Sequence, residues 1–389
     1  MKTDQLKQAF KEQFTDNPNE PLIFFAPGRV NLIGEHIDYN GGMVLPVAIS
    51  FGTYLACAYN GADSFRFLSL NFEGITAVPV FSDYTNPEHF DKWCKYPLGV
   101  VDQFIQKGFK PVGIDFLFSG DLPYSAGLSS SASIEMVTAV AMNNLLNHEE
   151  AMIDLVKLSK RAENEFVGVN CGIIDMFASG MGLKNHAMLL DCDTLALRQV
   201  PFDAKPYRLI IMNTNKKRGL ADSKYNERVE ECSEALKAIK QKFTINNLCE
   251  IKTGQMEDAL ELITNQTVKI RARHVISENQ RVHDAVAALE KGDIKRFGQL
   301  MSESHQSLKE DYEVTGFELD TIVETALSQP GVIGARMTGA GFGGCAIGLV
   351  DEAYLPDFIK NTGEIYKQIT GLTAEFFPAD IENGARKLV

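Results

Sequence analysis

The chain has 389 residues, of which 45% are hydrophobic and 23% are charged, and its formal net charge is −13. A chain of this length and hydrophobic content can bury the cores of two or three domains. The acidic balance excludes a domain-wide basic surface for nucleic acid or anionic lipid, so any bound phosphate must be held locally by backbone amides, a few cations or a metal.

The chain starts with MKTDQLKQAFKEQF, which has the pattern of a polar amphipathic helix and lacks the apolar core of a signal peptide. No apolar stretch approaches the length that spans a membrane. The seven cysteines are scattered without a CxxC pair, which argues against both a disulfide framework and a zinc site. We therefore expect a cytoplasmic protein with reduced thiols.

The segment GRVNLIGEHIDYNGG, residues 28–42, follows a strand predicted at residues 22–26. Within it, four charged or chargeable side chains alternate with apolar residues: Arg29, Glu35, His36 and Asp38. Charges held beside buried apolar residues need partners, and a polar ligand is one candidate. The alternative is a solvated loop rich in turn-forming glycine and asparagine.

A Gly-Ser-rich loop, GDLPYSAGLSSSASIEM at residues 120–136, runs into a helix predicted at residues 131–146. The free amides and the dipole of the first helical turn form an anion site. One serine would be enough to cap the helix, so three consecutive serines after Gly127 favour phosphate binding over capping alone. We expect one buried face on this helix, formed by Ile134, Val137, Ala141 and Leu145.

Strands and helices interleave along the rest of the chain, which indicates a mixed fold of the α+β or α/β class. The predicted strands are residues 44–58, 114–118, 187–193, 197–202 and 208–215, and the predicted helices are residues 223–241 and 268–289. The change of pattern puts a domain boundary near residues 180–205. Because long Gly/Ser linkers are missing, we expect the domains to pack against each other.

The segment ARMTGAGFGGCAIGLV contains Gly339-x-Gly341-x-x-Gly344, which matches a dinucleotide fingerprint formally. That fingerprint must open a helix, whereas residues 345–350 continue as a strand. A glycine turn between two strands is the better interpretation, either as a structural hairpin or as a close approach to a ligand. The chain also lacks a Walker A loop and the HRD and DFG signatures of protein kinases.

Together these three segments resemble the GHMP family of small-molecule kinases, whose phosphate loop has the form PxxxGLSSSA, here residues 123–132. Within that family, residues 28–42 are similar to the galactokinase signature. The resemblance extends to residues 92–101, 162–175, 222–232 and 304–320, and so spans nearly the whole chain. It implies the two-domain α+β architecture of GHMP kinases, with the active site in the interdomain cleft, an N-terminal domain at residues 1–185 and a C-terminal domain at residues 186–389.

By this resemblance, the activity is the ATP-dependent phosphorylation of galactose at its anomeric hydroxyl, which yields galactose 1-phosphate and ADP. The implied catalytic residues are Asp175 and Arg29, and the implied sugar-binding residues are Glu35, His36, Asp38, Gly172 and Tyr225. Without the resemblance, Asp175 would be interpreted as a capping or ion-paired residue. The chain departs from the usual family pattern at Asn170, where proline is common, and at Met176, where glutamine is common.

The resemblance also implies a site for Mg-ATP, and a monomer with no nucleic-acid or membrane partner. The implied ATP-binding residues are Trp93, Tyr96, Gly127, Leu128, Ser129, Ser130, Ser131 and Ala132. For the two aromatic residues, core packing is an equal alternative. Ser131 and Glu163 match the positions that hold Mg²⁺ in relatives, and one hydroxyl with one carboxylate suits a metal that keeps most of its waters.

Two other functions stay open at this point. A GHMP kinase for another sugar, such as N-acetylgalactosamine, would share these motifs. A non-enzymatic galactose sensor would also share the sugar signature, but the intact GLSSSAS segment favours an enzyme.

Overall fold

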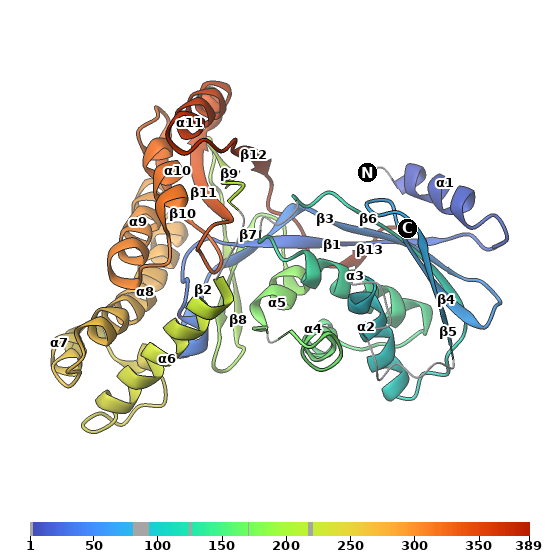
Figure 1. Cartoon of the computed structure of the whole chain (residues 1–389), viewed down its shortest axis with the longest axis horizontal. Helices are drawn as coiled ribbons and strands as arrows, with labels where there is room; N and C mark the ends of the chain where they lie inside the picture. The colour runs from blue at the N-terminus through green and yellow to red at the C-terminus, as the bar shows by residue number, and fades with distance from the viewer. Residues whose placement is uncertain (1–2, 81–92, 124–126, 170, 217–220) are drawn as a thin grey trace.

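The computed structural model describes residues 3–80, 93–123, 127–169, 171–216 and 221–389, with no side chains described at 221–223. Figure 1 shows an elongated molecule whose two lobes are joined by long strands of the N-terminal sheet. Among the helices of the described ranges, none is long and apolar enough to cross a membrane. The seven cysteines all lie within the described ranges, and none of them is paired in a disulfide.

The first lobe is built on a six-stranded sheet of order β13-β1-β3-β6-β4-β5. Its strands are β1 (Leu22–Asn31), β3 (Pro46–Tyr59), β4 (Ser64–Ser69), β5 (Ile75–Pro79), β6 (Ile114–Gly120) and β13 (Arg386–Lys387). All pairings are antiparallel except that of β4 with β6. Because side chains alternate along a strand, the sheet can bury both faces.

Helices cover both faces of this sheet (Figure 1). On one face, α1 (Thr3–Gln13) packs Leu6 and Phe10 into a small separate core. The helices on the other face are α2 (Lys95–Gln106), α3 (Ser130–Leu145), α4 (Met152–Arg161) and α5 (Ile174–Met181). The π-helical turn η3 (Ala162–Val167) continues directly from α4.

The second lobe is built on a four-stranded antiparallel sheet of order β10-β11-β9-β12. Its strands are β9 (Tyr207–Asn213), β10 (Val332–Met337), β11 (Cys345–Asp351) and β12 (Glu375–Ala379). Its helices are α6 (Ala221–Ile239), α7 (Met256–Leu260), α8 (Gln266–Glu290), α9 (Ile294–Ser307), α10 (Phe317–Leu327) and α11 (Leu355–Thr370). A three-stranded sheet of β2 (Met43–Val44), β7 (His186–Asp191) and β8 (Leu197–Pro201) lies between the lobes. The remaining short helical turns are η1 (Asp38–Asn40), η4 (Leu248–Glu250), η5 (Thr253–Gln255), η6 (Leu308–Tyr312) and η7 (Glu352–Tyr354).

The helices and strands predicted from the sequence are confirmed, with shifts at their ends. The strand predicted at residues 44–58 is two strands, because β2 pairs with β7 while β3 pairs with β1. The glycine-rich segment is a turn between the antiparallel strands β10 and β11, as predicted.

The predicted buried face of α3 is confirmed only in part. Val137 and Ala141 are fully buried and Ile134 and Leu145 pack against the core, but Ser133, Glu135 and Thr138 are fully buried as well. The physical reason is that α3 packs against the sheet on one side and against α2, α4 and α5 on others, so it has no single core-facing stripe. Ser133 is tolerated because its Oγ donates a hydrogen bond to the Ala26 carbonyl (2.7 Å).

The boundary after residue 185 remains a prediction, and two strand pairings cross it. β13, from the end of the chain, pairs with β1 through Lys387 opposite Phe24. β2, from the start of the chain, pairs with β7 through Met43 opposite Asp191. Both α1 and β13 therefore lie in the first lobe, and the segment after β1 reaches the sheet between the lobes.

Candidate active site

A cavity of about 250 Å³ lies where the segment after β1 meets α5, α6 and the β10–β11 turn. Its lining residues are Arg29, Asn31, Gly34, Glu35, His36, Asp38, Cys171, Gly172, Ile174, Asp175, Tyr225, Gly339 and Ala340. All seven residues predicted for catalysis and sugar binding are among them. The structure thus brings together side chains from distant parts of the sequence around one polar space.

Gly34 forms a turn that directs the segment after β1 toward the cavity. Its φ of +101° lies in the left-handed region, and a Cβ there would lie 2.7 Å from the Met43 carbonyl oxygen, so only glycine fits without strain. The Gly34 N–H donates to Oε1 of the buried Glu278 on α8 (3.0 Å). A helix of the second lobe therefore holds a segment that comes from the start of the chain.

Glu35 is buried and is held mainly by the second lobe. Its Oε1 accepts a hydrogen bond from the Gly339 N–H (2.7 Å), and its Oε2 accepts from Arg336 (3.3 Å) and from the Asn31 side-chain amide. Burial raises the pKa of Glu35, and the Arg336 charge and the Gly339 N–H oppose that rise. The β10–β11 glycine turn therefore supports the sugar side of the predicted site.

His36 also contacts this turn, and both of its ring nitrogens already have partners. Nε2 must donate to the Ala340 carbonyl (3.1 Å), so Nδ1 accepts from the Tyr39 hydroxyl (2.9 Å). Burial lowers the pKa of His36 to about 3, which keeps the imidazole neutral. A sugar hydroxyl can bond to this ring only by replacing one of these partners.

Asp38 begins η1 at the cavity wall, and in the described part of the structure no side chain hydrogen-bonds to its carboxylate. Burial raises its pKa to about 6; backbone N–H groups lower it, and the nearby Glu35 and Asp175 charges raise it further. A Cβ at Gly172 would lie 3.5 Å from Asp38 Oδ2. Asp38 is therefore an acceptor with free capacity, facing a residue that has no side chain.

Tyr225, from α6, lines the cavity beside His36. Its ring lies 5.7 Å from the His36 ring and 5.4 Å from the Tyr39 ring, measured between centroids. Burial and the nearby Asp38 and Asp175 charges raise the pKa of its hydroxyl. The hydroxyl therefore stays protonated and can both donate and accept a hydrogen bond.

Arg29 and Asp175 form a partly buried ion pair at the cavity wall. Arg29 Nε and Nη2 lie 2.8 and 2.6 Å from Asp175 Oδ1, and Arg29 Nη1 donates to the Gly127 carbonyl (2.9 Å). Ser129 Oγ donates to Asp175 Oδ2 (2.6 Å). The serine-rich loop therefore contacts both members of the predicted catalytic pair.

Ser129 itself does not cap α3, although it precedes the first helical residue. Its backbone is left-handed, with φ 62°, and its side chain makes no capping hydrogen bond. Ser129 is therefore not a side-chain cap of the helix, which was the alternative to phosphate binding. The first N–H groups of a helix have no partner within it and remain able to bind an anion. Residues 124–126 of this loop, like Asn170, lie outside the described residues.

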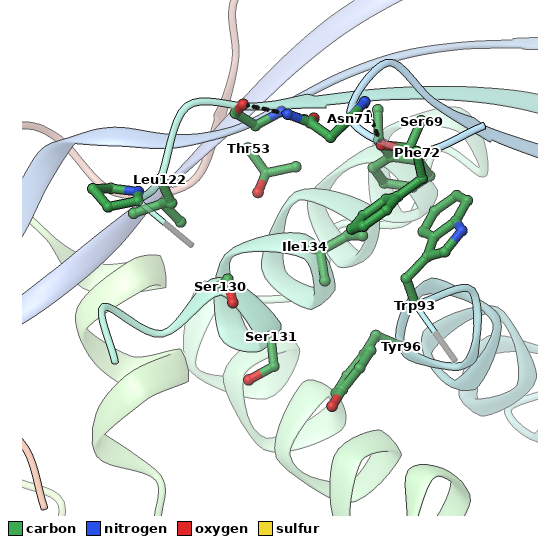
Figure 2. A pocket seen from close by; sticks show the side chains of 13 residues that line it. Thr53, Ser69, Asn71, Phe72, Trp93, Tyr96, Leu122, Ser130, Ser131 and Ile134 are labelled. Atoms are coloured by element: carbon green, nitrogen blue, oxygen red, sulfur yellow. Dashed lines mark hydrogen bonds between the residues drawn. The ribbon is translucent and has the colours of Figure 1, made fainter. Parts of the chain in front are cut away.

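A second cavity, of about 210 Å³, lies on the other side of the serine loop. Figure 2 shows Trp93 and Phe72 at one end and Ser130 and Ser131 toward the other. The Trp93 ring lies 6.1 Å from the Phe72 ring at an interplanar angle of 15°. The other lining residues are Thr53, Ser69, Asn71, Tyr96, Phe118, Gly120, Leu122, Pro123 and Ile134. An aromatic space that opens beside a helix N-terminus has the form of a nucleotide pocket.

The predicted ATP-binding residues divide into three groups. Trp93, Tyr96, Ser130 and Ser131 line the second cavity. Leu128 and Ala132 are buried, so only their backbone can reach a ligand. The Gly127 carbonyl and the Ser129 hydroxyl face the Arg29–Asp175 pair instead.

Glu163 and Ser131 lie together at the N-terminus of α3. Glu163 is buried on η3, which raises its pKa, while hydrogen bonding to Cys171 and Ser131 lowers it. Within the described residues, no group of three or more His, Cys, Asp and Glu side chains could hold a metal. A hydroxyl beside a single carboxylate fits a divalent ion that takes its other ligands from phosphates and water.

Arg336, Asn31 and the role of the glycine turn in holding Glu35 were not predicted from the sequence. Arg336 is fully buried and reaches Glu35 from β10. A signal was available, since an arginine in the apolar strand VIGARM must find a buried acidic partner.

Comparisons with known proteins identify the family. Residues 95–183 match the family profile for the GHMP kinases N terminal domain, and residues 285–364 match the profile for the GHMP kinases C terminal domain. The mevalonate kinase of Methanococcus jannaschii shares the fold, with a TM-score of 0.69 at 22% identity over 94% of this chain and 100% of that one. The fold and the site therefore define a GHMP kinase.

The first lobe identifies the branch of that family. Residues 8–59 match the galactokinase galactose-binding signature. The chain is 46% identical to a galactokinase of Clostridium perfringens over 100% of both chains and 47% identical to one of Bacillus subtilis over 99% of both. A structure of Lactococcus lactis galactokinase complexed with galactose has a TM-score of 0.91 at 41% identity, covering 99% of each chain. The chain belongs to the galactokinase family.

Proposed function

We propose that this galactokinase transfers the γ-phosphoryl group of ATP to the anomeric hydroxyl of galactose, giving galactose 1-phosphate and ADP. The observation that carries this proposal is the Arg29–Asp175 pair, which lies in the wall of the polar cavity and contacts the serine loop. A sugar in that cavity and a nucleotide in the aromatic one would meet at this pair. The second lobe would then contribute Tyr225 and the β10–β11 turn to a site built mainly on the first lobe.

The sugar would be held by hydrogen bonds around the polar cavity. Asp38 and Glu35 would accept hydrogen bonds from sugar hydroxyls, and Tyr225 would both donate and accept one. Because Gly172 has no side chain, the sugar could approach the backbone there. We propose that His36 joins this set by exchanging its bond to the Ala340 carbonyl for one to a sugar hydroxyl.

The chemistry would rest on position and electrostatics. Asp175 would accept or orient the proton of the attacking hydroxyl, and Arg29 would offset negative charge on the transferred group. Phosphoryl transfer passes through a loose transition state, so alignment of the hydroxyl with the phosphate matters more than strong base catalysis.

We propose that the nucleotide binds across the serine loop. The aromatic rings of Trp93 and Tyr96 would hold the adenine. The phosphates would contact the backbone amides of the α3 N-terminus, at Gly127, Leu128, Ser129, Ser130, Ser131 and Ala132.

We further propose that the divalent ion required by this class of kinase is Mg²⁺, held by Ser131 and Glu163. When bound, it would neutralise charge on the phosphate oxygens. We also propose that the protein acts as a monomer in the cytoplasm. The absence of disulfides among the described cysteines supports the cytoplasmic location, because reduced cysteines are typical of a reducing compartment.

The test is ADP release with Mg-ATP and three sugars: galactose, glucose and N-acetylgalactosamine. Galactose should be turned over and its 4-epimer glucose hardly at all, because a site built to bond a hydroxyl rejects an analogue that leaves polar groups unpaired. Asp175→Asn should lower kcat by about 10²–10⁴-fold, whereas Asp203→Asn, at an exposed site, serves as a matched control. Comparable turnover of glucose, or a near-normal kcat for Asp175→Asn, would overturn the proposal.

A further inference from the structure

Ser129 stands in a backbone conformation that glycine ordinarily supplies. Its φ is 62°, in the left-handed region, and Gly127, two residues earlier, also has a positive φ of 72°. A non-glycine residue in this region carries a steric cost from its Cβ. We therefore expect the serine side chain to make a stabilising contact that glycine could not make.

This contact is a short hydrogen bond to the carboxylate of Asp175. Ser129 Oγ lies 2.6 Å from Asp175 Oδ2 and donates to it, because an ionised carboxylate can only accept. The residue is 7% exposed, so water competes little for this bond. The hydroxyl makes no capping bond to the α3 backbone, which leaves the carboxylate as the partner that accounts for it.

This bond completes the fixation of Asp175. Arg29 holds Oδ1 through two nitrogens, and Ser129 holds Oδ2, so both carboxylate oxygens are tied to the protein. Arg29 is itself tied to the same loop through the Gly127 carbonyl. The rotation of the carboxylate is therefore set from two sides, and its remaining lone pairs can face the sugar cavity.

We propose that Ser129 is a positioning residue for phosphoryl transfer: its hydroxyl orients Asp175, while only its backbone amide takes part in phosphate binding. This inference rests on the catalytic role proposed for Asp175. It differs from the expectation for a serine in a phosphate loop, whose hydroxyl would contact phosphate or metal. The two roles predict different kinetic constants.

The experiment compares Ser129→Ala with Ser129→Gly. Both remove the hydroxyl, but glycine also relieves the left-handed strain. Each variant should lose kcat by roughly tenfold to a hundredfold, because a misaligned reacting group costs rate rather than affinity. The KM for ATP should change less than threefold, and Ser129→Gly should unfold at a higher temperature than Ser129→Ala.

A retained kcat in Ser129→Gly would show that only the backbone shape matters and would overturn the inference. A loss that falls mainly on the KM for ATP, or on the concentration of Mg²⁺ required, would assign the hydroxyl to phosphate or metal and would also overturn it. Both variants can be checked for folding by galactose titration and thermal unfolding.

A double-mutant cycle separates this inference from the proposed function. In an Asp175→Asn background, adding Ser129→Ala should lower kcat by less than twofold, because the group that Ser129 orients is already impaired. If the two losses multiply in full, Ser129 acts independently of Asp175 and the inference fails. If Asp175→Asn alone keeps a near-normal kcat, the catalytic role proposed for Asp175 is wrong. The single variant shows this without the double mutant.

Discussion

Galactose binding should weaken as the pH falls from 7 to 5, because Asp38 titrates in this range. Burial raises the pKa of Asp38 to about 6 in the sugar-free protein, helped by the neighbouring Glu35 and Asp175 charges. Two sugar hydroxyls that donate to the carboxylate would favour its ionised form and lower that pKa in the complex. Lowering the pH therefore stabilises the free protein relative to the complex, so the affinity for galactose falls as the pH falls.

The size of the effect follows from the ionised fraction of Asp38. With a pKa of about 6, that fraction is about 90% at pH 7 and about 10% at pH 5, so galactose should bind roughly tenfold more weakly at pH 5. His36 does not contribute, because burial lowers its pKa to about 3 and it stays neutral throughout.

Isothermal titration of galactose at pH 5, 6 and 7 measures this dependence directly. Asp38→Asn is the matched control, since it keeps the shape of the side chain and removes its titration. The variant should bind more weakly at pH 7 and should have a nearly flat pH profile. A flat profile in the wild type, or an equal slope in the variant, would refute the assignment of the titrating group.

Three further outcomes are expected. In the sugar-free protein, Asp38→Asn should raise the free energy of unfolding at pH 7 by about 1–3 kcal/mol, measured by urea unfolding, because the raised pKa means that ionising Asp38 costs stability as the pH rises toward 7; an unchanged stability would contradict this. Glu163→Gln should raise the Mg²⁺ concentration needed for half-maximal rate, and Ser131→Ala should do so more mildly since water can replace the hydroxyl; if neither shifts it, both residues are structural. Gly341→Ala should lower the free energy of unfolding by about 2–4 kcal/mol, because φ is +78° and the added Cβ would lie 2.1 Å from a backbone carbonyl oxygen. Gly339→Ala should lower it by only about 1–2 kcal/mol, because φ is +82° but no described atom beyond its chain neighbours lies nearer than 4.0 Å to the added Cβ. Equal losses in the two variants would rule out the steric argument.

Much of this site could be predicted from short segments of the sequence. Arg29, Glu35, His36 and Asp38 lie within ten residues, so a local pattern is enough to group them. The glycine turn before residues 345–350 was also predictable, because turn and strand patterns are local.

The resemblance grouped Asp175, Gly172 and Tyr225 with the segment at residues 28–42, but the contacts that hold Glu35 in place could not be predicted, because no local pattern records them. Glu35 meets the Gly339 N–H across 304 residues of sequence, and that pairing depends on how β10, β11 and α8 pack. The same holds for α3, whose buried Glu135 and Thr138 contradict a simple amphipathic pattern because its neighbours surround it. The hydrogen bond from Ser129 to Asp175 is a third case, since three serines in a row gave no sign of which one would face the carboxylate.

The position of the phosphate on the product tests the central claim most directly. Galactose and Mg-ATP should be incubated with the wild-type protein, and the products examined by ³¹P–¹H NMR correlation and by quantification of ADP. We predict one phosphosugar with the phosphate on the anomeric carbon, formed in equal amount to ADP. A phosphate on another carbon, or ADP formed without any phosphosugar, would contradict the account of how Arg29 and Asp175 align the sugar.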